Sequence, residues 1–540
     1  MLRELPHYAP FTPLQKRLDA LTAHGLPLES AQQQIAESHG FLTWRQLEVH
    51  LQVAEEPSDA FEYLACLSYV WWDRPRRWEQ ARAMFSDNPA LEQRDIYAAC
   101  VTGNVQLVEA FLDDDAKSLE RRGGYCDWEP LLYACYSRIE LPDRSTSDVV
   151  HLLLDRGANP AAFFRWGGIY HFSALTGLFG EGERGPINQP PHQDYQVLTT
   201  RLLDAGASCN DSQALYNRMF QPDNSTLLTL IEHGLNKDHL CNWFATVRGG
   251  RLVPNPAKTL DYQLQWAVKS NFIDRVKILL EHGANPTQKL PGDGRLAKIA
   301  ATRGYNDVTD DLIRHGAKPY RLGKVDRFLN YCLSANRGGA EAMLAKSQTL
   351  IKRADKRNPD AMNSAAANGT SDALELMLDL GFCIHSAATE TPLHHAAHNG
   401  HLDTVKNLLD RGASLHKRDP MYLATPLGWA QAGNKYEVIE YLENLAIGLF
   451  DLINVNDSDR IRHWLTEHPE ELNAPLEDSL ETTLKKHPNA WQTPLAYAAT
   501  SGLADMVEVL LLAGADKNVA SKDGTPLADL CNEEVRKLLV

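Results

Sequence analysis

The sequence has 540 residues, 44% of them hydrophobic, and a net charge of −16 at pH 7. The ordinary apolar fraction excludes a disordered chain, and the acidic balance argues against nucleic acid or an anionic membrane as the partner, since both attract basic surfaces. No stretch approaches the roughly eighteen apolar residues of a membrane span, and the first residues lack the apolar core of a signal peptide, so we expect neither.

Helices are expected first in a leader segment at the start of the chain. The pattern predicts them at about 12–23, 29–38 and 43–52. A further pair over 61–69 and 77–85 is interpreted as the divergent first unit of a repeat array. Because the end of such an array would otherwise expose an apolar face, we interpret residues 1–55 as a helical cap.

A helix ending of the form Leu-Leu-x-x-Gly-Ala recurs along the rest of the chain. Clean copies are LLDRGAN at 153–159 and LLEHGAN at 279–285. The intervals between copies fit a period of about 33 residues, with insertions in the longer ones. Only glycine adopts a positive φ without penalty, so we expect it at Gly283 and Gly412, just after their helices. The eight glycines of this ending are Gly157, Gly206, Gly234, Gly283, Gly316, Gly381, Gly412 and Gly514.

The cleanest whole repeat begins at Thr391 and reads TPLHHAAHNGHLDTVKNLLDRGAS. Thr391 can cap a first helix by accepting a hydrogen bond from an orphan N–H, and Pro392 suits the first helical position, where no N–H is needed. Leu393, Ala396 and Ala397 then give that helix an apolar face. The same Thr-Pro-Leu start recurs at Thr425, Thr493 and Thr525.

A Thr-Pro-Leu-His-x-Ala-Ala start with a Leu-Leu-x-x-Gly-Ala ending resembles the ankyrin repeat, over roughly residues 95–540. The resemblance implies an all-α ankyrin-repeat solenoid of stacked helix–turn–helix pairs, with β-turn fingers along one edge. It also implies a turn-stabilising hydrogen bond from His394. Within residues 35–51, the pattern HGFxxWxxL resembles the helical leader of bacterial ankyrin proteins. We therefore divide the chain into a capping segment (1–55), repeats with insertions (56–320), a degenerate repeat (321–364) and regular repeats with a C-terminal cap (365–540).

Insertions concentrate between residues 160 and 262. The segment 161–172 adds aromatic residues after a Gly-Ala-Asn-Pro finger, and 180–195 is rich in glycine and proline. Inserts in repeat arrays map to loops, often on a binding face, and aromatic and arginine side chains anchor interfaces. A structural role for the rings is the alternative. The candidate partner-binding residues are Phe163, Phe164, Arg165, Trp166 and Tyr170.

The sequence shows no motif for catalysis, a cofactor or a metal. Phosphate-binding loops, zinc-protease helices, EF-hand loops and serine-hydrolase elbows are all missing. His233, His282 and His315 share one repeat position, but helices pack about 8–10 Å apart, which is too far for joint metal ligation. A cation that interacts with the helix dipole is the simpler interpretation. We predict no catalytic residue, no cofactor and no metal.

These observations together predict a scaffold or adaptor that binds another protein on its concave face and fingers. The acidic charge is compatible with a partner that carries a basic patch. The alternative is an enzyme or small-ligand binder with a site in the inserts between 160 and 262, whose polar residues include Arg165, His171, Glu181, His192 and His239. Nine cysteines without a Cys-x-x-Cys pair favour reduced thiols, and we expect a cytoplasmic monomer that binds neither nucleic acid nor membrane.

Overall fold

A computed structural model describes most of the chain from residue 61 onward and part of the leader. It contains two compact units, residues 1–288 (unit 1) and 289–540 (unit 2). The described residues are 14, 18–19, 21–23, 27–38, 44, 47, 61–70, 73, 75–166, 169–183, 185–246, 252–290, 294–385, 390–445, 447–482, 484–522, 524–531 and 533–540.

The leader contributes a small core of its own. The middle expected helix is present as α2 (Leu28–Ser38), whereas most of the other two expected helices, and the HGF part of the leader motif, lie outside the described residues. Buried side chains of the leader, among them Ile35 and Leu47, form one cluster with Val70. The leader therefore packs on the start of the repeat region.

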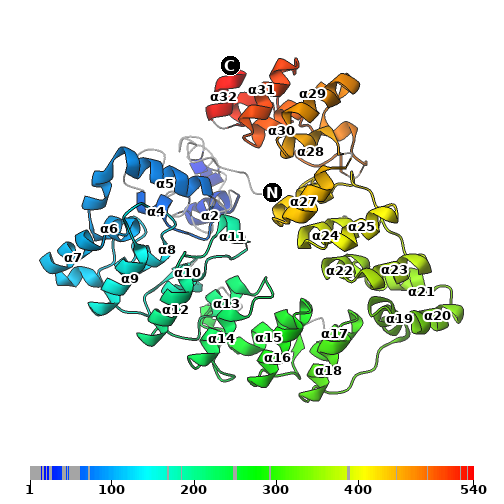
Figure 1. Cartoon of the computed structure of the whole chain (residues 1–540), viewed down its shortest axis with the longest axis horizontal. Coiled ribbons are helices and arrows are strands. Elements are labelled where there is room, and N and C mark those ends of the chain that lie inside the picture. The colour runs from blue at the N-terminus through cyan, green and yellow to red at the C-terminus, as the bar shows by residue number, and fades with distance from the viewer. Residues whose placement is uncertain are drawn as a thin grey trace. The chain divides into compact units, whose positions relative to one another are not determined.

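Unit 1 consists of helix pairs that follow one another along the chain (Figure 1). The first helix of each pair contacts the first helix of the next, in the order α4, α6, α8, α10, α13 and α15. The pairs are α4 (Phe61–Ala65) with α5 (Pro75–Asp87), α6 (Ile96–Thr102) with α7 (Val105–Asp114), α8 (Pro130–Tyr136) with α9 (Thr146–Asp155), α10 (Ala174–Phe179) with α12 (Tyr195–Asp204), α13 (Ser212–Arg218) with α14 (Ser225–Glu232), and α15 (Thr259–Lys269) with α16 (Ile273–Glu281). Short helices η1 (Pro89–Gln93), η2 (Ala116–Leu119) and α11 (Gly185–Asn188) lie between them.

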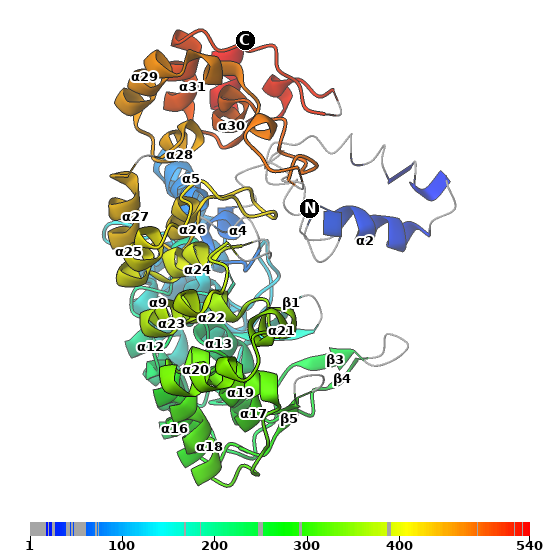
Figure 2. The ribbon, with the colours of Figure 1, turned by 90° about the vertical axis from the view of Figure 1, so that its right-hand side faces the viewer.

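Two insertions of unit 1 form β-hairpins instead of plain loops. Strands β1 (Phe163–Trp166) and β2 (Tyr170–Ser173) pair antiparallel, as do β3 (Phe244–Thr246) and β4 (Leu252–Pro254). Figure 2 shows β3 and β4 extending to one side of the helices α13 and α16. These hairpins lengthen the fingers that join one helix pair to the next.

Unit 2 repeats the same arrangement with more regular pairs. Its first helices contact one another in the order α17, α19, α22, α24, α26, α28 and α30. The pairs are α17 (Leu296–Thr302) with α18 (Asn306–Arg314), α19 (Lys324–Leu333) with α20 (Arg337–Ala345), α22 (Ala361–Ala367) with α23 (Ser371–Leu380), α24 (Pro392–Asn399) with α25 (Leu402–Asp410), α26 (Pro426–Ala432) with α27 (Tyr436–Glu443), α28 (Leu449–Asn454) with α29 (Ser458–Glu467), and α30 (Pro494–Thr500) with α31 (Ala504–Leu512). The remaining elements are β5 (Lys289–Leu290), β6 (Gly294–Arg295), α21 (Leu350–Arg357), η3 (Pro469–Asn473), η4 (Leu476–Asp478), η5 (Leu527–Asp529) and α32 (Glu533–Leu539).

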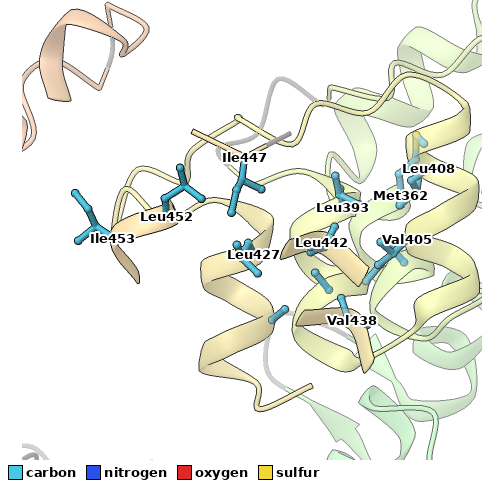
Figure 3. Packing of buried hydrophobic residues seen from close by; sticks show 14 of the residues in the cluster. Met362, Leu393, Val405, Leu408, Leu427, Val438, Leu442, Ile447, Leu452 and Ile453 are labelled. Carbon is cyan, nitrogen blue, oxygen red and sulfur yellow. The ribbon is translucent and has the colours of Figure 1, made fainter. Parts of the chain in front are cut away.

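Successive repeats of unit 2 share one apolar core. Leu393 of α24 and Leu427 of α26 are buried in the same cluster as Val405 and Val438 of the second helices, and Figure 3 shows their side chains gathered between the ribbons. Ala396 and Ala397 are fully buried where α24 contacts α22 and α26. Their small side chains let the first helices approach closely.

The glycine prediction is confirmed in both units. All eight glycines of the recurring ending have positive φ, between 85° and 107°. After α16, the N–H of Gly283 bonds the carbonyl of Leu280 at 3.1 Å, and that of Ala284 bonds Leu279 at 2.9 Å. This is the paired hydrogen bonding of a Schellman ending, which satisfies the last carbonyls of a helix.

The repeated histidines have a local structural role. The Nδ1 atoms of His233, His282 and His315 lie 2.8, 2.7 and 2.8 Å from the carbonyl oxygen four residues earlier in their own helices. Each imidazole therefore serves the last turn of its helix. Arg156 and Arg411 occupy the same position, and each pairs with carboxylates on the second helix of the preceding repeat.

Candidate partner-binding surface

The β1–β2 hairpin is fixed to the helix stack at its base. The N–H of Ala174 bonds the carbonyl of Ala162 at 3.2 Å. The hydroxyl of Ser173 accepts a hydrogen bond from the N–H of Thr176 at 3.2 Å, which caps α10, and donates to the buried carboxylate of Asp211 on the next repeat. Because these bonds join the end of β2 to two helix pairs, the hairpin has one fixed orientation.

The inner face of the hairpin carries rings that pack on unit 1. Phe164 stacks on Trp128 with ring centroids 4.5 Å apart and meets Tyr136 edge-on at 5.5 Å. The indole Nε1 of Trp166 donates to the carbonyl of Ser68 at 3.2 Å, and its ring stacks on buried Phe172. Phe164 and Trp166 are therefore half-buried and packed against unit 1.

The outer face presents Phe163 and Arg165 of the candidate set, together with His171. Phe163 is 38% exposed, and its ring stacks on His171 with centroids 4.1 Å apart. The guanidinium of exposed Arg165 lies 4.4 Å above the ring of Phe244 on β3. Tyr170 is the register partner of Trp166 and so lies on the inner face, at one end of β2, but it is 36% exposed. We call Phe163, Arg165, Tyr170, His171 and Phe244 the hairpin surface.

The two hairpins of unit 1 support each other at this surface. The N–H of Phe244 donates to the carbonyl of Ile169 at 3.2 Å. Tyr170 meets buried Trp243 edge-on, with centroids 5.6 Å apart. Burial lowers the pKa of His171, with Asp211 opposing the shift and Arg165 adding to it. A neutral imidazole and one guanidinium thus lie among exposed aromatic rings.

The polar residues that supported an enzyme site have separate partners. Glu181 pairs with Arg218. His192 is buried, with its Nε2 2.8 Å from the hydroxyl of Thr146, and burial lowers its pKa to about 3. The Nδ1 of His239 accepts from its own finger. Among the residues that the structure describes, no group of three or more His, Cys, Asp or Glu side chains could hold a metal ion.

The Gly/Pro-rich insert 180–195 is anchored by a buried arginine that the sequence reasoning missed. Arg138 donates to the carbonyls of Pro190 at 2.7 Å and Ser137 at 2.8 Å, and also to the carbonyl of Gly177. Gln189 donates to Asp73 at 3.2 Å, whose carboxylate also pairs with buried Arg77. No periodicity marks Arg138 or Asp73 as anchors of this insert, because Pro190 and Gln189 lie 52 and 116 residues further along the chain.

Comparison with known families locates the repeats independently. A model of ankyrin repeats in three copies matches residues 329–419 and 362–459, and a model of the single ankyrin repeat matches residues 491–522. These matches lie in unit 2, where the Thr-Pro-Leu starts occur. None of the helices in the described part of the chain is long and apolar enough to cross a membrane.

Proposed function

We propose, from the premise that the chain is an ankyrin-repeat protein, that it is a scaffold or adaptor and that a partner protein binds its hairpin surface. Ankyrin repeats are generally modules of protein–protein interaction. The observation that carries the proposal is that the β1–β2 hairpin combines packed and exposed side chains. Its inner rings lock the hairpin in place, and Phe163, Arg165 and Tyr170 remain exposed. A fixed aromatic surface loses little conformational entropy when a partner covers it.

Other features support a binding role rather than catalysis. His192, His239 and Glu181 of the inserts each serve a separate hydrogen bond or ion pair. The net charge of −16 favours fast encounter with a partner that carries a basic patch. Burial raises the pKa of the Cys66 and Cys100 thiols, which suits unreactive, reduced cysteines in a cytoplasmic protein. We propose a monomer.

The proposed domain organisation follows the sequence boundaries. Residues 1–55 act as a cap, which the cluster formed by Ile35, Leu47 and Val70 supports. Residues 56–320 and 365–540 hold the repeats, with a degenerate repeat at 321–364. Helix α21 lies in that degenerate segment, as an addition to the helix pair α19/α20.

The test compares two variants of the full-length chain. In the first, F163A, R165A and Y170A are combined. In the second, V197A and L228A remove exposed apolar side chains from α12 and α14, and this variant is the matched control. Affinity purification with mass spectrometry identifies proteins that bind the wild type, and purified candidates are then measured directly.

We expect the hairpin variant to bind at least about tenfold more weakly than the control, because aromatic and arginine anchors carry most interface energy. The melting temperatures of both variants should stay near that of the wild type. A partner that binds the hairpin variant as tightly as the wild type would show that this surface is not the binding site.

A further inference from the structure

A second exposed surface lies in unit 2, on the finger between α25 and α26. Asp419 is fully buried at its centre. One carboxylate oxygen accepts from the N–H groups of Met421 and Tyr422, both at 2.8 Å. The other accepts from the N–H of Ala424 at 2.9 Å and from the indole of Trp429 at 3.1 Å. Four donors on one carboxylate fix the path of this turn.

The turn also holds a strained residue. Leu423 has φ +56°, a left-handed conformation that is unfavourable for a leucine because of its Cβ. Its side chain is buried in a cluster with Leu476, Leu480 and Ala490, so this packing offsets the strain. Backbone strain of this kind concentrates at binding sites and switch regions.

The insert 475–491 supports the finger through polar contacts as well. The Nδ1 of His487 accepts from the N–H of Asn489 at 3.1 Å, so its Nε2 carries the hydrogen and donates to the carbonyl of Met421 at 3.1 Å. Lys417 pairs with Glu481 at 2.7 Å. The finger and the insert therefore form one rigid block.

This block displays an apolar pair beside lysines. Met421 and Tyr422 are 62% and 63% exposed. Lys485 and Lys486, just before His487, are exposed and form no ion pair among the described residues. Lys522 donates to the carbonyl of Lys485 at 3.3 Å and also pairs with Glu477 at 3.3 Å. We call Met421, Tyr422, Lys485, Lys486 and Lys522 the finger surface.

We infer that the finger surface binds an acidic, extended segment of a partner protein, with an apolar side chain on Met421 and Tyr422 and carboxylates facing the lysines. Methionine and tyrosine are enriched at interface cores, and a turn ordered in advance avoids the entropy of ordering on binding. The lysines are a basic site on a chain of net charge −16, which selects an acidic segment. The inference rests on the proposed adaptor role and adds a surface for a second ligand, of opposite charge to the basic-patch partner.

The test uses the full-length chain and short fluorescent peptides in which one phenylalanine or leucine is flanked by aspartate and glutamate. Matched peptides carry asparagine and glutamine in place of the acids, or lysine and arginine. Phosphatidylserine vesicles serve as a competing anionic surface. Three variants are compared with the wild type: M421A with Y422A, K485Q with K486Q, and the hairpin variant F163A, R165A and Y170A.

We expect acidic peptides to bind at least about tenfold more tightly than their amide counterparts, and more weakly as salt rises. Removing Met421 and Tyr422 should weaken binding about tenfold without changing the melting temperature, since both side chains are exposed. The lysine variant should lose the salt dependence. The hairpin variant should bind the acidic peptide like the wild type, which separates this inference from the hairpin surface.

Three results would overturn the inference. One is the absence of any preference for acidic over amide peptides. Another is unchanged peptide binding after loss of Met421 and Tyr422. The third is tighter binding to phosphatidylserine vesicles than to every acidic peptide, because the ligand would then be a lipid surface. A charge swap sharpens the test: K485E with K486E should transfer the preference to the basic peptides.

Discussion

Units 1 and 2 build the same helix pairs from different local signals. In unit 2, Thr425 and Thr493 cap first helices that begin with proline. In unit 1, first helices are capped by Asp95, Ser173 and Asp211 instead. Eight second helices, four in each unit, end alike at glycines with positive φ. The matches to ankyrin-repeat models lie in unit 2, so we infer that they depend on the first-helix start, whereas stacking depends on the second-helix ending and the apolar faces.

The units also differ in how they hold their insertions. In unit 1, buried charged groups bind the insert 180–195 into the stack, with Arg138 bonded to backbone carbonyls and Asp73 paired with Arg77. In unit 2, the insert 475–491 is held mainly by a small apolar cluster around Leu423 and by His487. The attachment of the insert in unit 1 therefore depends more strongly on a few buried polar contacts than that of the insert in unit 2.

The largest expected effect is the loss of Arg138. Replacing it with methionine leaves the carbonyls of Pro190, Ser137 and Gly177 without their donor inside unit 1. We expect unit 1 to lose roughly 4 kcal/mol of stability, because hydrogen bonds to a buried charge are among the strongest. Hydrogen exchange read by mass spectrometry should show faster exchange around α8 and α10 and unchanged exchange in α24 and α26. Unchanged exchange in unit 1 would contradict the contrast between the units.

In the β1–β2 hairpin, removing packed side chains can be compared with removing exposed ones. Combining F164A with W166A removes rings that pack on Trp128 and Phe172, and should destabilise unit 1 by about 3 kcal/mol. Combining F163A with R165A and Y170A removes more exposed side chains and should cost clearly less, about 1 kcal/mol, because only the contacts with His171, Phe244 and Trp243 are lost. Urea unfolding of both variants measures the difference. Equal losses would mean that the outer side chains are structural too.

Acid should destabilise both units through buried neutral histidines. Burial lowers the pKa of His394 to about 4, from 6.5. Between these values the unfolded chain binds a proton that the folded chain does not, so stability falls as pH drops below about 6.5 and levels off near 4, a loss of roughly 3 kcal/mol. In unit 1, burial lowers the pKa of His192 to about 3, so the stability of this unit should also fall with acid, and the fall should continue down to about pH 3. Unfolding of H394Q and H192Q across this range should show a shallower pH dependence, each in its own unit.

His394 illustrates what the family resemblance supplied. Its Nδ1 accepts from the N–H of Thr391 at 3.2 Å, and its Nε2 lies 3.3 Å from the carbonyl of Ala424 in the next finger. The resemblance implied a turn-stabilising bond, and the structure confirms it. The contact with Ala424 depends on how two repeats stack, which one repeat taken alone does not reveal.

The sequence predicted features that arise from nearby residues and missed those that depend on distant ones. Helix endings at Gly283 and Gly412 follow from local conformational limits, so they could be predicted residue by residue. Which rings of the β1–β2 hairpin face inward depends on strand register and on Trp128, about one repeat earlier in the chain. Arg138 carries no periodic signal, since its partners Gly177 and Pro190 lie 39 and 52 residues further along the chain.

The smallest expected effect is that of replacing the glycines at the ends of the second helices, which both units share. Gly412 has φ +89°, and an added Cβ would meet nothing within 4 Å. Gly283 has φ +85°, and its added Cβ would meet only the flexible side chain of Lys237. Alanine at either position should therefore cost about 1 kcal/mol, mostly from the backbone conformation. Equal losses in urea unfolding would mean that the helix-two ending does the same work in both units.

Gly103 also has a positive φ but, unlike Gly283 and Gly412, it packs closely against the backbone of a neighbouring repeat. Its φ is +76°, and an added Cβ would lie 2.7 Å from the backbone of Ser145 and Thr146, which cannot move without shifting α9. Gly103→Ala should therefore destabilise unit 1 clearly more than Gly283→Ala does, since overpacking adds about 1–3 kcal/mol to the conformational term. If all three variants lost the same stability, close packing between neighbouring repeats would add nothing to the glycine requirement, and the conformational argument alone would explain every glycine in the array.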